Sequence, residues 1–547
     1  MRGISERISE RRPTACEDRW SLASFFSCDG IDYPFAHRCR TLERMKPPSS
    51  SPSSSLVRGL GPLMATALVV GTVIGSGVFK KPAKIAEDIS HFGLVALLWI
   101  VGGALVLVGA LAYAEVTVLL PRAGGNYVFL REAYGRLAGF LWGWVDFCII
   151  RSASLAALAT IFTESLHDIV RNEAFQRAVG LPSGTHLGFW PQRLVTVSIL
   201  AVLAWVNVRG VRWGGIVQLV ITLVKVGSLL AIAVLPFAVL AGWMSSPTRP
   251  NFDHLHPVWP DDWRSVSLGG LGSAFLGVLW AYHGWQNLAP VAEEVRRPQR
   301  NLPLALLGGV ALIIALYLGA NLAYSLVVPH NEMAKLGQTT VATEFSLRLL
   351  GSLGAAAASA AVMASVFGAL NGNLLVGPRL LYAMGEDGLA PRRLREVHAR
   401  YRTPALAIAV LAAWSSFQIL TVAFLTWIGA LEESKSHFDR LTDFAMFGAV
   451  IFETLAVVSI FVFRRRYPDA ERPYRCPGYP FVPALYVVLP AFVLVNMFAH
   501  QKVEALAGVG FIVLGAIVYG VLGLGRKRPI VEGTCEADLM GKKTNGQ

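Results

Sequence analysis

Long apolar segments separated by short polar loops fill the chain from about residue 60 to residue 525. Since about 20 apolar residues cross a bilayer as a helix, each segment is expected to span a membrane once. Twelve segments are long enough, with approximate limits 60–87, 92–120, 137–165, 191–209, 213–241, 268–295, 303–328, 353–384, 404–428, 442–464, 482–500 and 504–525. The pattern therefore predicts an all-α membrane protein with twelve transmembrane helices.

Small and polar residues interrupt the first segment, where Gly71–Phe79 contains three glycines and two hydroxyl side chains. Each glycine costs about 1 kcal/mol relative to alanine inside a helix. Within a membrane, a broken helix is tolerated where its freed backbone is buried in protein or lines a cavity. The stretch is therefore either a binding site, whose half-helix N-terminus would attract a carboxylate, or a surface for close helix packing.

The sixth segment carries a similar interruption, a polar and aromatic stretch at Trp280–Asn287. The first and sixth helices are corresponding members of two five-helix halves. Paired interruptions at matching positions indicate a transporter binding site built on inverted repeats. The second interruption favours the binding-site interpretation of the first.

Charge supports the membrane assignment and gives an orientation. Only 16% of the residues are charged, against about 25% in soluble domains. The net charge of +13 comes from arginines gathered in alternate short loops, which is the positive-inside pattern rather than a nucleic-acid-binding face. We therefore expect no nucleic-acid partner, a lipid bilayer around the chain, and both termini in the cytoplasm.

The six cysteines show neither metal-ligand spacing nor a disulfide framework, so no metal or cofactor is expected. Residues 1–58 are predicted to be a disordered cytoplasmic tail, unless translation starts at Met45. The predicted organisation continues with a ten-helix transport core over 59–464. Helices 11 and 12, with the loop before them, follow over 465–525, and a cytoplasmic tail covers 526–547.

Several motifs occur in order along the chain. They are Gly71–Phe79, Pro121–Tyr127, Ala281–Trp285, Glu293–Pro303, Phe367–Asn373, Pro378–Met384 and Arg472–Pro480. Through them the chain resembles the amino acid–polyamine–organocation (APC) superfamily, and within it the branch of L-type amino acid transporters and bacterial serine/threonine exchangers. The resemblance covers about residues 58 to 525.

The resemblance implies a LeuT-type fold, a 5+5 inverted repeat with helices 1 and 6 unwound and two extra helices. It also implies amino acid transport by alternating access. Helix dipoles place a substrate carboxylate on helix N-termini and an ammonium on freed carbonyls. The implied site residues are Gly75, Ser76 and Gly77 for the carboxylate, Thr72, Val73 and Trp280 for the ammonium, and the adjacent Ala281.

Lys225 lies deep in the fifth segment, where an unpaired lysine costs at least about 2.5–3.5 kcal/mol. It is about a dozen residues from the expected cytoplasmic end, too far to reach the interface easily. Members of the resembled family place a lysine where sodium-coupled relatives bind sodium. The resemblance therefore implies that Lys225 contacts helix 1 carbonyls near Gly71 and that transport is sodium-independent.

Other polar residues of helices 6 and 8 have two interpretations each. Trp280 is expected to gate the site, as an aromatic in the interruption, or else to pack. His283 stands where many relatives have glycine or aspartate, and either senses protons or is structural. Gln286 and Asn373 either contact substrate or join helices.

Charged residues near the site also have two interpretations. Asp146 and Arg151 are five residues apart in helix 3, so an α-helix does not stack them on one face. A structural or gating pair is expected, with a partner that the sequence does not identify. Four other charged residues lie near expected cytoplasmic helix ends, and they form either a closed-gate network or solvated loop charges. They are Glu115, Glu293, Glu294 and Arg379.

Together these observations predict a plasma-membrane transporter, the bacterial inner membrane being implied, that exchanges small neutral L-amino acids without sodium. A proton-coupled symporter is the main alternative. There are two weaker alternatives: a polyamine or cation permease, with Asp146 and Glu164 as acidic contacts, and a receptor that binds amino acids without transporting them. The sequence shows no recognisable nucleophile–base pair and no set of metal ligands, so an enzyme is not expected. The loop at 166–192 lacks cysteine, so no disulfide-linked heavy chain is expected, and the chain is predicted to be a monomer or weak homo-oligomer.

Overall fold

A computed structural model describes residues 58–337, 339–429 and 437–525. Most of the predicted tail over 1–58 and all of the tail over 526–547 lie outside the described residues. Within the described ranges the regular elements are helices, and the only β-type pairing is an isolated bridge between Leu60 and Val295.

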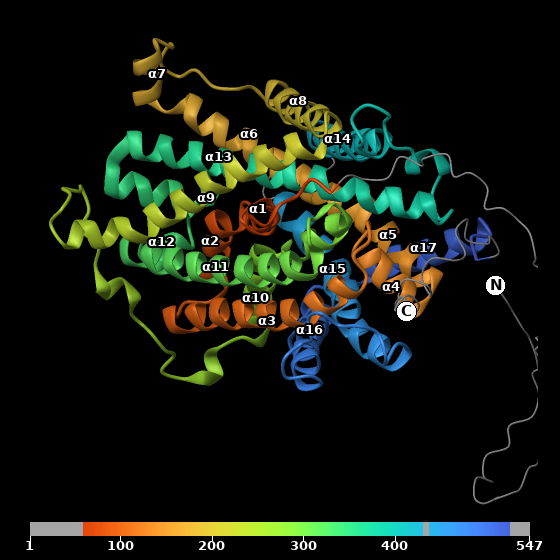
Figure 1. The fold of residues 1–547 in the computed structure, drawn as a ribbon. Coiled ribbons are helices and arrows are strands. Elements are labelled where there is room, and N and C mark those ends of the chain that lie inside the picture. The colour runs from red at the N-terminus through yellow and green to blue at the C-terminus, as the bar shows by residue number, and fades with distance from the viewer. Residues whose placement is uncertain (1–57, 338, 430–436, 526–547) are drawn as a thin grey trace, which may run out of the picture. The chain divides into compact units, whose positions relative to one another are not determined.

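The helices follow one another in the order that the apolar segments predict (Figure 1). The first half contains α1 (Pro62–Val73), α2 (Gly77–Asp88), α3 (Phe92–Leu119), α4 (Asn126–Tyr134), α5 (Arg136–Val145), η1 (Asp146–Arg151), α6 (Ser152–Arg171), α7 (Glu173–Val179), α8 (Phe189–Val208) and α9 (Val211–Leu240). The second half contains η2 (Phe252–Leu255), η3 (Trp263–Ser265), α10 (Leu268–Tyr282), η4 (Trp285–Glu294), α11 (Pro298–Val327), α12 (His330–Met333), α13 (Val341–Glu386), η5 (Arg392–Arg395), α14 (Ala405–Trp427), α15 (His437–Arg466), α16 (Phe481–His500) and α17 (Lys502–Val521).

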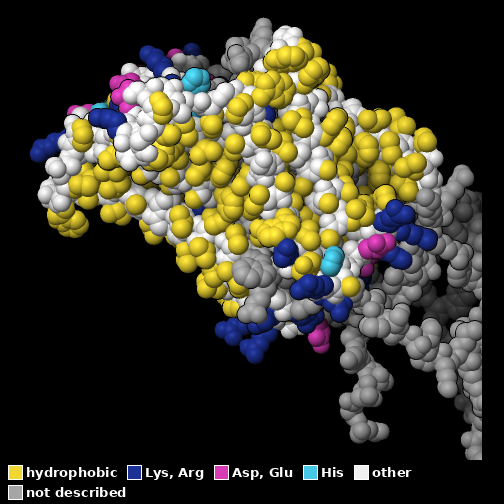
Figure 2. Space-filling view, turned by 90° about the horizontal axis from the view of Figure 1, so that it is seen from above, with side chains coloured by type: hydrophobic (Ala, Val, Ile, Leu, Met, Phe, Trp, Pro, Cys, Tyr) yellow, Lys and Arg dark blue, Asp and Glu magenta, His cyan; other side chains and the backbone are white. Residues whose placement is uncertain are grey.

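Ten helical stretches of the described ranges are long and apolar enough to cross a membrane, and α17 adds a shorter apolar stretch over Ala505–Val521. The chain is thus an all-helical, multi-pass membrane protein. Figure 2 shows one face, on which apolar side chains form a broad surface while charged side chains gather at its margins. Exposed Leu, Val, Phe and Trp on α8, α9, α14, α16 and α17 are consistent with contact with lipid tails.

The first segment is two helices, because α1 ends at Val73 and α2 begins at Gly77. Ile74 leaves helical geometry with ψ at 88°, and three residues separate the two helices. The sixth segment also breaks, since α10 ends at Tyr282 and continues after His283 and Gly284 as the 3-10 helix η4. Gly284 takes a φ of 104°, in the left-handed region that side chains disfavour. Both interruptions predicted from the sequence are breaks in the structure.

Helices distant in sequence surround the two breaks. α1 packs against α9, α11 and α13, and α2 packs against α10. α1 and α2 lie among these helices in Figure 1, and the side chains of Val70, Ile74 and Val78 are almost fully buried. The unwound residues are thus enclosed by protein, which is the environment that a broken membrane helix requires.

Two predicted segments differ in detail. The third, 137–165, is α5, η1 and α6, and η1 is a π-helical turn rather than α-helix. The eighth, 353–384, belongs to α13, which starts earlier at Val341 and is interrupted at Gly351 by a φ of 73°. Only glycine adopts that conformation without strain, so two helices meet at Gly351, and the predicted segment belongs to the second of them.

Candidate functional site

The N-terminus of α2 faces the first break with unsatisfied donors. The first N–H groups of a helix have no partner inside it. Here these are the amides of Gly77 and Val78, because those of Phe79 and Lys80 donate to the Ser76 carbonyl oxygen at 3.1 and 3.0 Å. Ser76 precedes them; it is 1% exposed, and its hydroxyl has no hydrogen-bond partner within the described ranges. Since a buried polar group normally finds a partner, this hydroxyl marks a place suited to an anionic or hydrogen-bonding ligand.

Lys225 reaches the same break from α9. Its Nζ atom donates to the carbonyl oxygens of Gly71 at 2.6 Å and Ile74 at 2.5 Å, and its side chain is fully buried. The contact with Gly71 agrees with the sequence-based expectation. The ammonium thus satisfies two carbonyl groups at the C-terminal end of α1, where the helix dipole favours a cation.

The hydroxyl of Tyr317 on α11 joins the two breaks. It lies 3.1 Å from the carbonyl oxygen of Val73 and 3.0 Å from that of Ala281. The hydroxyl of Thr72 donates to the carbonyl of Leu68 at 2.7 Å and lies 3.2 Å from that of Gly284. Most implied site residues of helices 1 and 6 therefore lie together at one centre.

Gly77 contacts Ala281 closely, because a Cβ atom at Gly77 would lie 2.6 Å from the Ala281 Cα atom. The sequence-based interpretation made Gly77 a point where a carboxylate meets the backbone. In the structure its missing side chain also allows α2 and α10 to touch. A larger residue here would separate the half-helices as well as affect any ligand.

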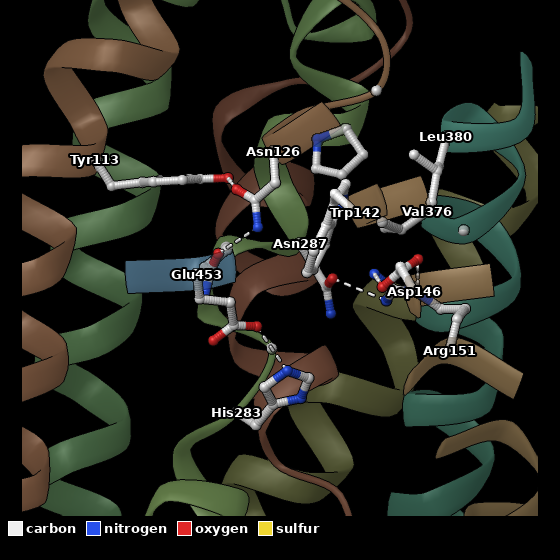
Figure 3. A pocket seen from close by; sticks show the side chains of 15 residues that line it. Tyr113, Asn126, Trp142, Asp146, Arg151, His283, Asn287, Val376, Leu380 and Glu453 are labelled. Carbon is white, nitrogen blue, oxygen red and sulfur yellow. Dashed lines mark hydrogen bonds and ion pairs between the residues drawn. The ribbon is translucent and has the colours of Figure 1, made fainter. Parts of the chain in front are cut away.

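A small cavity adjoins the second break, and Figure 3 shows the polar side chains around it. Its volume of about 20 Å³ gives room for about one water molecule, far less than an amino acid. The lining residues are Tyr113, Gly124, Asn126, Trp142, Asp146, Arg151, His283, Gly284, Gln286, Asn287, Pro290, Val376, Gly377, Leu380 and Glu453. In this conformation the helices are closed around the breaks.

Asp146 and Arg151 form an ion pair in this wall, which corrects the expectation that their spacing keeps them apart. The Arg151 Nη2 atom lies 3.2 Å from Asp146 Oδ1, and both side chains are buried. The reason is the π-helical turn η1, in which residues five apart stack on one face as residues four apart do in an α-helix. Arg151 also donates to the amide oxygens of Asn287 at 2.9 Å and Asn373 at 2.7 Å.

His283 pairs with Glu453 of α15, a residue that the sequence analysis did not single out. The Nε2 atom of His283 lies 2.8 Å from Glu453 Oε1, and the two side chains are 15% and 12% exposed. The ring of Trp280 stacks on that of His283 with centroids 6.0 Å apart and an interplanar angle of 6°. Trp280 is therefore held beside the break by its neighbour.

Gln286 joins helices through Asn126. The Tyr113 hydroxyl donates to Asn126 Oδ1 at 2.5 Å, and Asn126 Nδ2 donates to Gln286 Oε1 at 2.7 Å. The Nε2 atom of Gln286 is buried without a partner in the described part of the chain. Gln286 thus serves helix packing through one atom and offers a donor to the cavity through another.

Several contacts tie η4 to α13 and to the chain around Leu60. The buried Arg379 and Glu294 form an ion pair at 2.8 Å, and Glu293 accepts from the Ala123 amide at 3.1 Å. The amide of Leu60 donates to the Glu294 carbonyl at 3.0 Å. Glu294 and Arg379 are thus paired and buried rather than solvated, and the closed-gate network stays a prediction.

Glu115 lies in a separate network with the loop before α16. It pairs with Arg464 at 2.7 Å and Arg472 at 3.3 Å, and accepts from the Cys476 amide at 2.6 Å. Burial, and then the charge of Glu115, raises the pKa of the Cys476 thiol to about 11. This network anchors the loop and contributes no side chain to the cavity.

Sequence reasoning missed Glu453, Tyr317, Asn126 and Asn287. A carboxylate inside the apolar pattern of the tenth segment was the one available signal for Glu453, because a charge within a span needs a partner. No group of three or more His, Cys, Asp or Glu side chains suited to a metal occurs in the described ranges.

Residues 60–522 match the sequence profile of the family described as amino acid permease. The chain is 32% identical over 444 residues to the serine/threonine exchanger SteT of Bacillus subtilis (strain 168), covering 81% of this chain and 91% of SteT. It is 29% identical to the mouse Asc-type amino acid transporter 1, covering 87% of this chain and 83% of that protein. It is also 29% identical to the human large neutral amino acids transporter small subunit 2, covering 85% of this chain and 80% of that protein.

Proposed function

Because the chain belongs to the amino acid permease family, and is therefore an amino acid transporter rather than an enzyme, we propose that it exchanges small neutral L-amino acids without sodium. The name of the bacterial relative, a serine/threonine exchanger, supports both exchange and a small substrate. The plasma membrane, as the bacterial inner membrane, is the proposed location.

The observation that carries sodium independence is the position of the Lys225 ammonium. It occupies the two carbonyl groups of Gly71 and Ile74 that a small cation would otherwise need as ligands. The hydroxyl of Ser365 adds a donor to the carbonyls of Ile74 and Gly75. A side-chain amine in that place supports transport that needs no sodium.

We propose that the substrate carboxylate binds the N-terminus of α2 at Gly75, Ser76 and Gly77. The orphaned Ser76 hydroxyl and the helix dipole support this place. The ammonium group would meet carbonyls near Thr72, Val73 and Trp280. The substrate side chain would then point toward Ala281, His283, Gln286 and Asn373 beside the cavity.

The finer architecture belongs to the same proposal. Counting the broken pair α10 and η4 as one span, and α17 as another, gives twelve crossings arranged as a LeuT-type repeat of five plus five with two extra helices. The arginine pattern supports termini in the cytoplasm. The transport core is proposed to extend over 59–464, and the chain to work as a monomer or weak homo-oligomer without a disulfide-linked partner.

The weaker alternatives lose support at particular residues. A polyamine or cation permease would need acidic contacts, yet Asp146 pairs with Arg151, and Glu164 lies 3.3 Å from the Lys80 ammonium. A non-transporting receptor would bind amino acids without moving them, which a flux measurement separates from exchange.

The test is uptake of radiolabelled amino acids into proteoliposomes that hold the purified protein. Vesicles are preloaded with unlabelled serine, threonine or alanine, or left empty, in sodium-free buffer at equal internal and external pH. We expect uptake into preloaded vesicles only, unchanged when sodium is added. Equal uptake into empty vesicles would contradict exchange, and a sodium requirement would contradict the role of Lys225.

A further inference from the structure

His283 and Glu453 join two elements that are far apart in the sequence. His283 lies in the break between α10 and η4, whereas Glu453 lies in α15. Their hydrogen bond of 2.8 Å spans 170 residues of sequence, and both side chains line the small cavity (Figure 3). Since the cavity closes around them, any charge that they carry is enclosed with little water.

The other charged groups of this cavity balance one another. Asp146 and Arg151 of η1 form their own ion pair, and the amide oxygens of Asn287 and Asn373 complete the contacts of the guanidinium. Tyr113 of α3 bonds Asn126 of α4, and Tyr486 of α16 is the remaining titratable neighbour. α6 and α17 also pack against α15 but contribute no side chain to the cavity lining.

The charge of Glu453 must therefore be balanced by His283 or by a proton of its own. With a neutral imidazole and an ionised carboxylate, the cavity holds one excess negative charge. Enclosing an unbalanced charge costs several kcal/mol, whereas one proton shared by the pair leaves the cavity neutral. Closure and proton binding are thus coupled by the pair itself.

We propose that His283 and Glu453 form a proton-binding site, and that the helix breaks close only when this site holds one proton. The inference rests on the proposed exchange function and adds the condition under which it runs. The proton enters from water on the side that is open and stays on the pair while the cavity is closed. In exchange, both the inward and the outward step carry it, so no net proton movement results.

The sign of the pH dependence follows from this coupling. The closed state binds the proton more tightly than the open state, so closure is supported at low pH and lost as pH rises. For one proton, the exchange rate falls by up to about tenfold per pH unit above its midpoint. A pair that only holds helices together by a hydrogen bond would predict no such slope.

The test measures exchange in preloaded proteoliposomes from pH 5.5 to pH 9.0, with equal pH on both sides. We expect the wild-type rate to fall above a midpoint. Glu453→Gln keeps a hydrogen-bonding side chain but removes the excess charge, so its rate should become independent of pH. Glu332→Gln is the matched control, since Glu332 pairs with Arg348 outside the cavity and its side chain is 50% exposed.

A second variant and a second readout test the proposal even if Glu453→Gln fails to fold. His283→Gln leaves the carboxylate to bind the proton alone, so the midpoint should shift by at least about one pH unit rather than vanish. In weakly buffered detergent solution, adding substrate above the midpoint should make wild-type protein take up a proton, which an indicator dye reports. Glu453→Gln should take up none.

The outcomes separate this inference from the proposed function. Exchange with a flat wild-type pH profile and no proton uptake would overturn the proton site and leave exchange standing. Uptake into empty vesicles with net proton entry that Glu453→Gln abolishes would overturn exchange and support the proton site. If both variants merely scale the rate equally at every pH, the pair is a packing contact and the proposal is wrong.

Discussion

The ammonium group of Lys225 bonds carbonyl oxygens that a continuous helix would have kept in its own hydrogen-bond ladder. In such a helix, the carbonyl of Gly71 would bond the amide of Gly75, and that of Ile74 would bond the amide of Val78. The break removes those partners, and one lysine of α9 replaces both. A side chain from another helix thereby stabilises a backbone shape that the local sequence alone would not hold.

Replacing this group tests its importance at the residue scale. Lys225→Met keeps much of the apolar stem but leaves the buried Gly71 carbonyl unsatisfied, at about 1–3 kcal/mol, and the Ile74 carbonyl with the Ser365 hydroxyl alone. We expect amino acid exchange to fall at least about tenfold, since 1.4 kcal/mol corresponds to a factor of ten. Lys335→Met, at an exposed position, should exchange as the wild type does. Wild-type flux from Lys225→Met would contradict the assigned role.

At the scale of elements, the π-helical turn η1 decides which residues meet. One extra residue in the turn places Asp146 and Arg151 together and aims the guanidinium at Asn287 and Asn373. The turn thus connects helix 3 to the second break and to α13. It turns two charges that would be costly in isolation into a buried, compensated pair.

Breaking that pair should destabilise the fold. Asp146→Asn leaves the Arg151 charge buried without its counter-ion, and the expected loss is about 3–5 kcal/mol. Thermal unfolding of the purified protein in detergent should show a clearly lower midpoint. Asp168→Asn, at an exposed position near the end of α6, should leave the midpoint unchanged. An unaltered midpoint for Asp146→Asn would mean that Asn287 and Asn373 alone satisfy the guanidinium.

The breaks could be predicted from sequence, whereas the pairings around them could not. Glycines and polar residues inside apolar segments marked Gly71–Phe79 and Trp280–Asn287, and the cost of an intramembrane charge marked Lys225. The partner of His283 could not be predicted, because Glu453 follows it by 170 residues and no local periodicity links the two positions. The Asp146–Arg151 pair was missed because α-helical spacing was assumed where the chain forms a π-turn.

At the scale of the whole described molecule, a buried ion pair lies between two elements that both contribute to the lining of the cavity. Arg379 of α13 and Glu294 of η4 are 0% and 1% exposed, and the bridge of Leu60 to Val295 lies beside them. Since η4 follows the second break, this contact ties the end of the broken helix to α13. A gate that opens between these two elements would separate the two side chains.

Weakening the pair should favour the state that is open on this side. Glu294→Gln leaves Arg379 without its counter-ion in the closed form, so water access relieves a buried charge. In a cysteine-free background, a cysteine at Val376, which lines the cavity, should react faster with a maleimide reagent in Glu294→Gln than in its parent. Glu332→Gln should leave the reaction rate unchanged, and equal rates in all three would contradict a closing role.

The Tyr317 hydroxyl has a consequence for the way these parts move. By bonding Val73 at the end of α1 and Ala281 near the end of α10, it fixes both helices to α11 at one point. If the half-helices rotate about this contact, it becomes their pivot, and the atoms around Tyr317 move less than the helix ends at the membrane surfaces. A ligand at that pivot would meet the same backbone groups from either side of the membrane, and its affinity would be nearly equal on both.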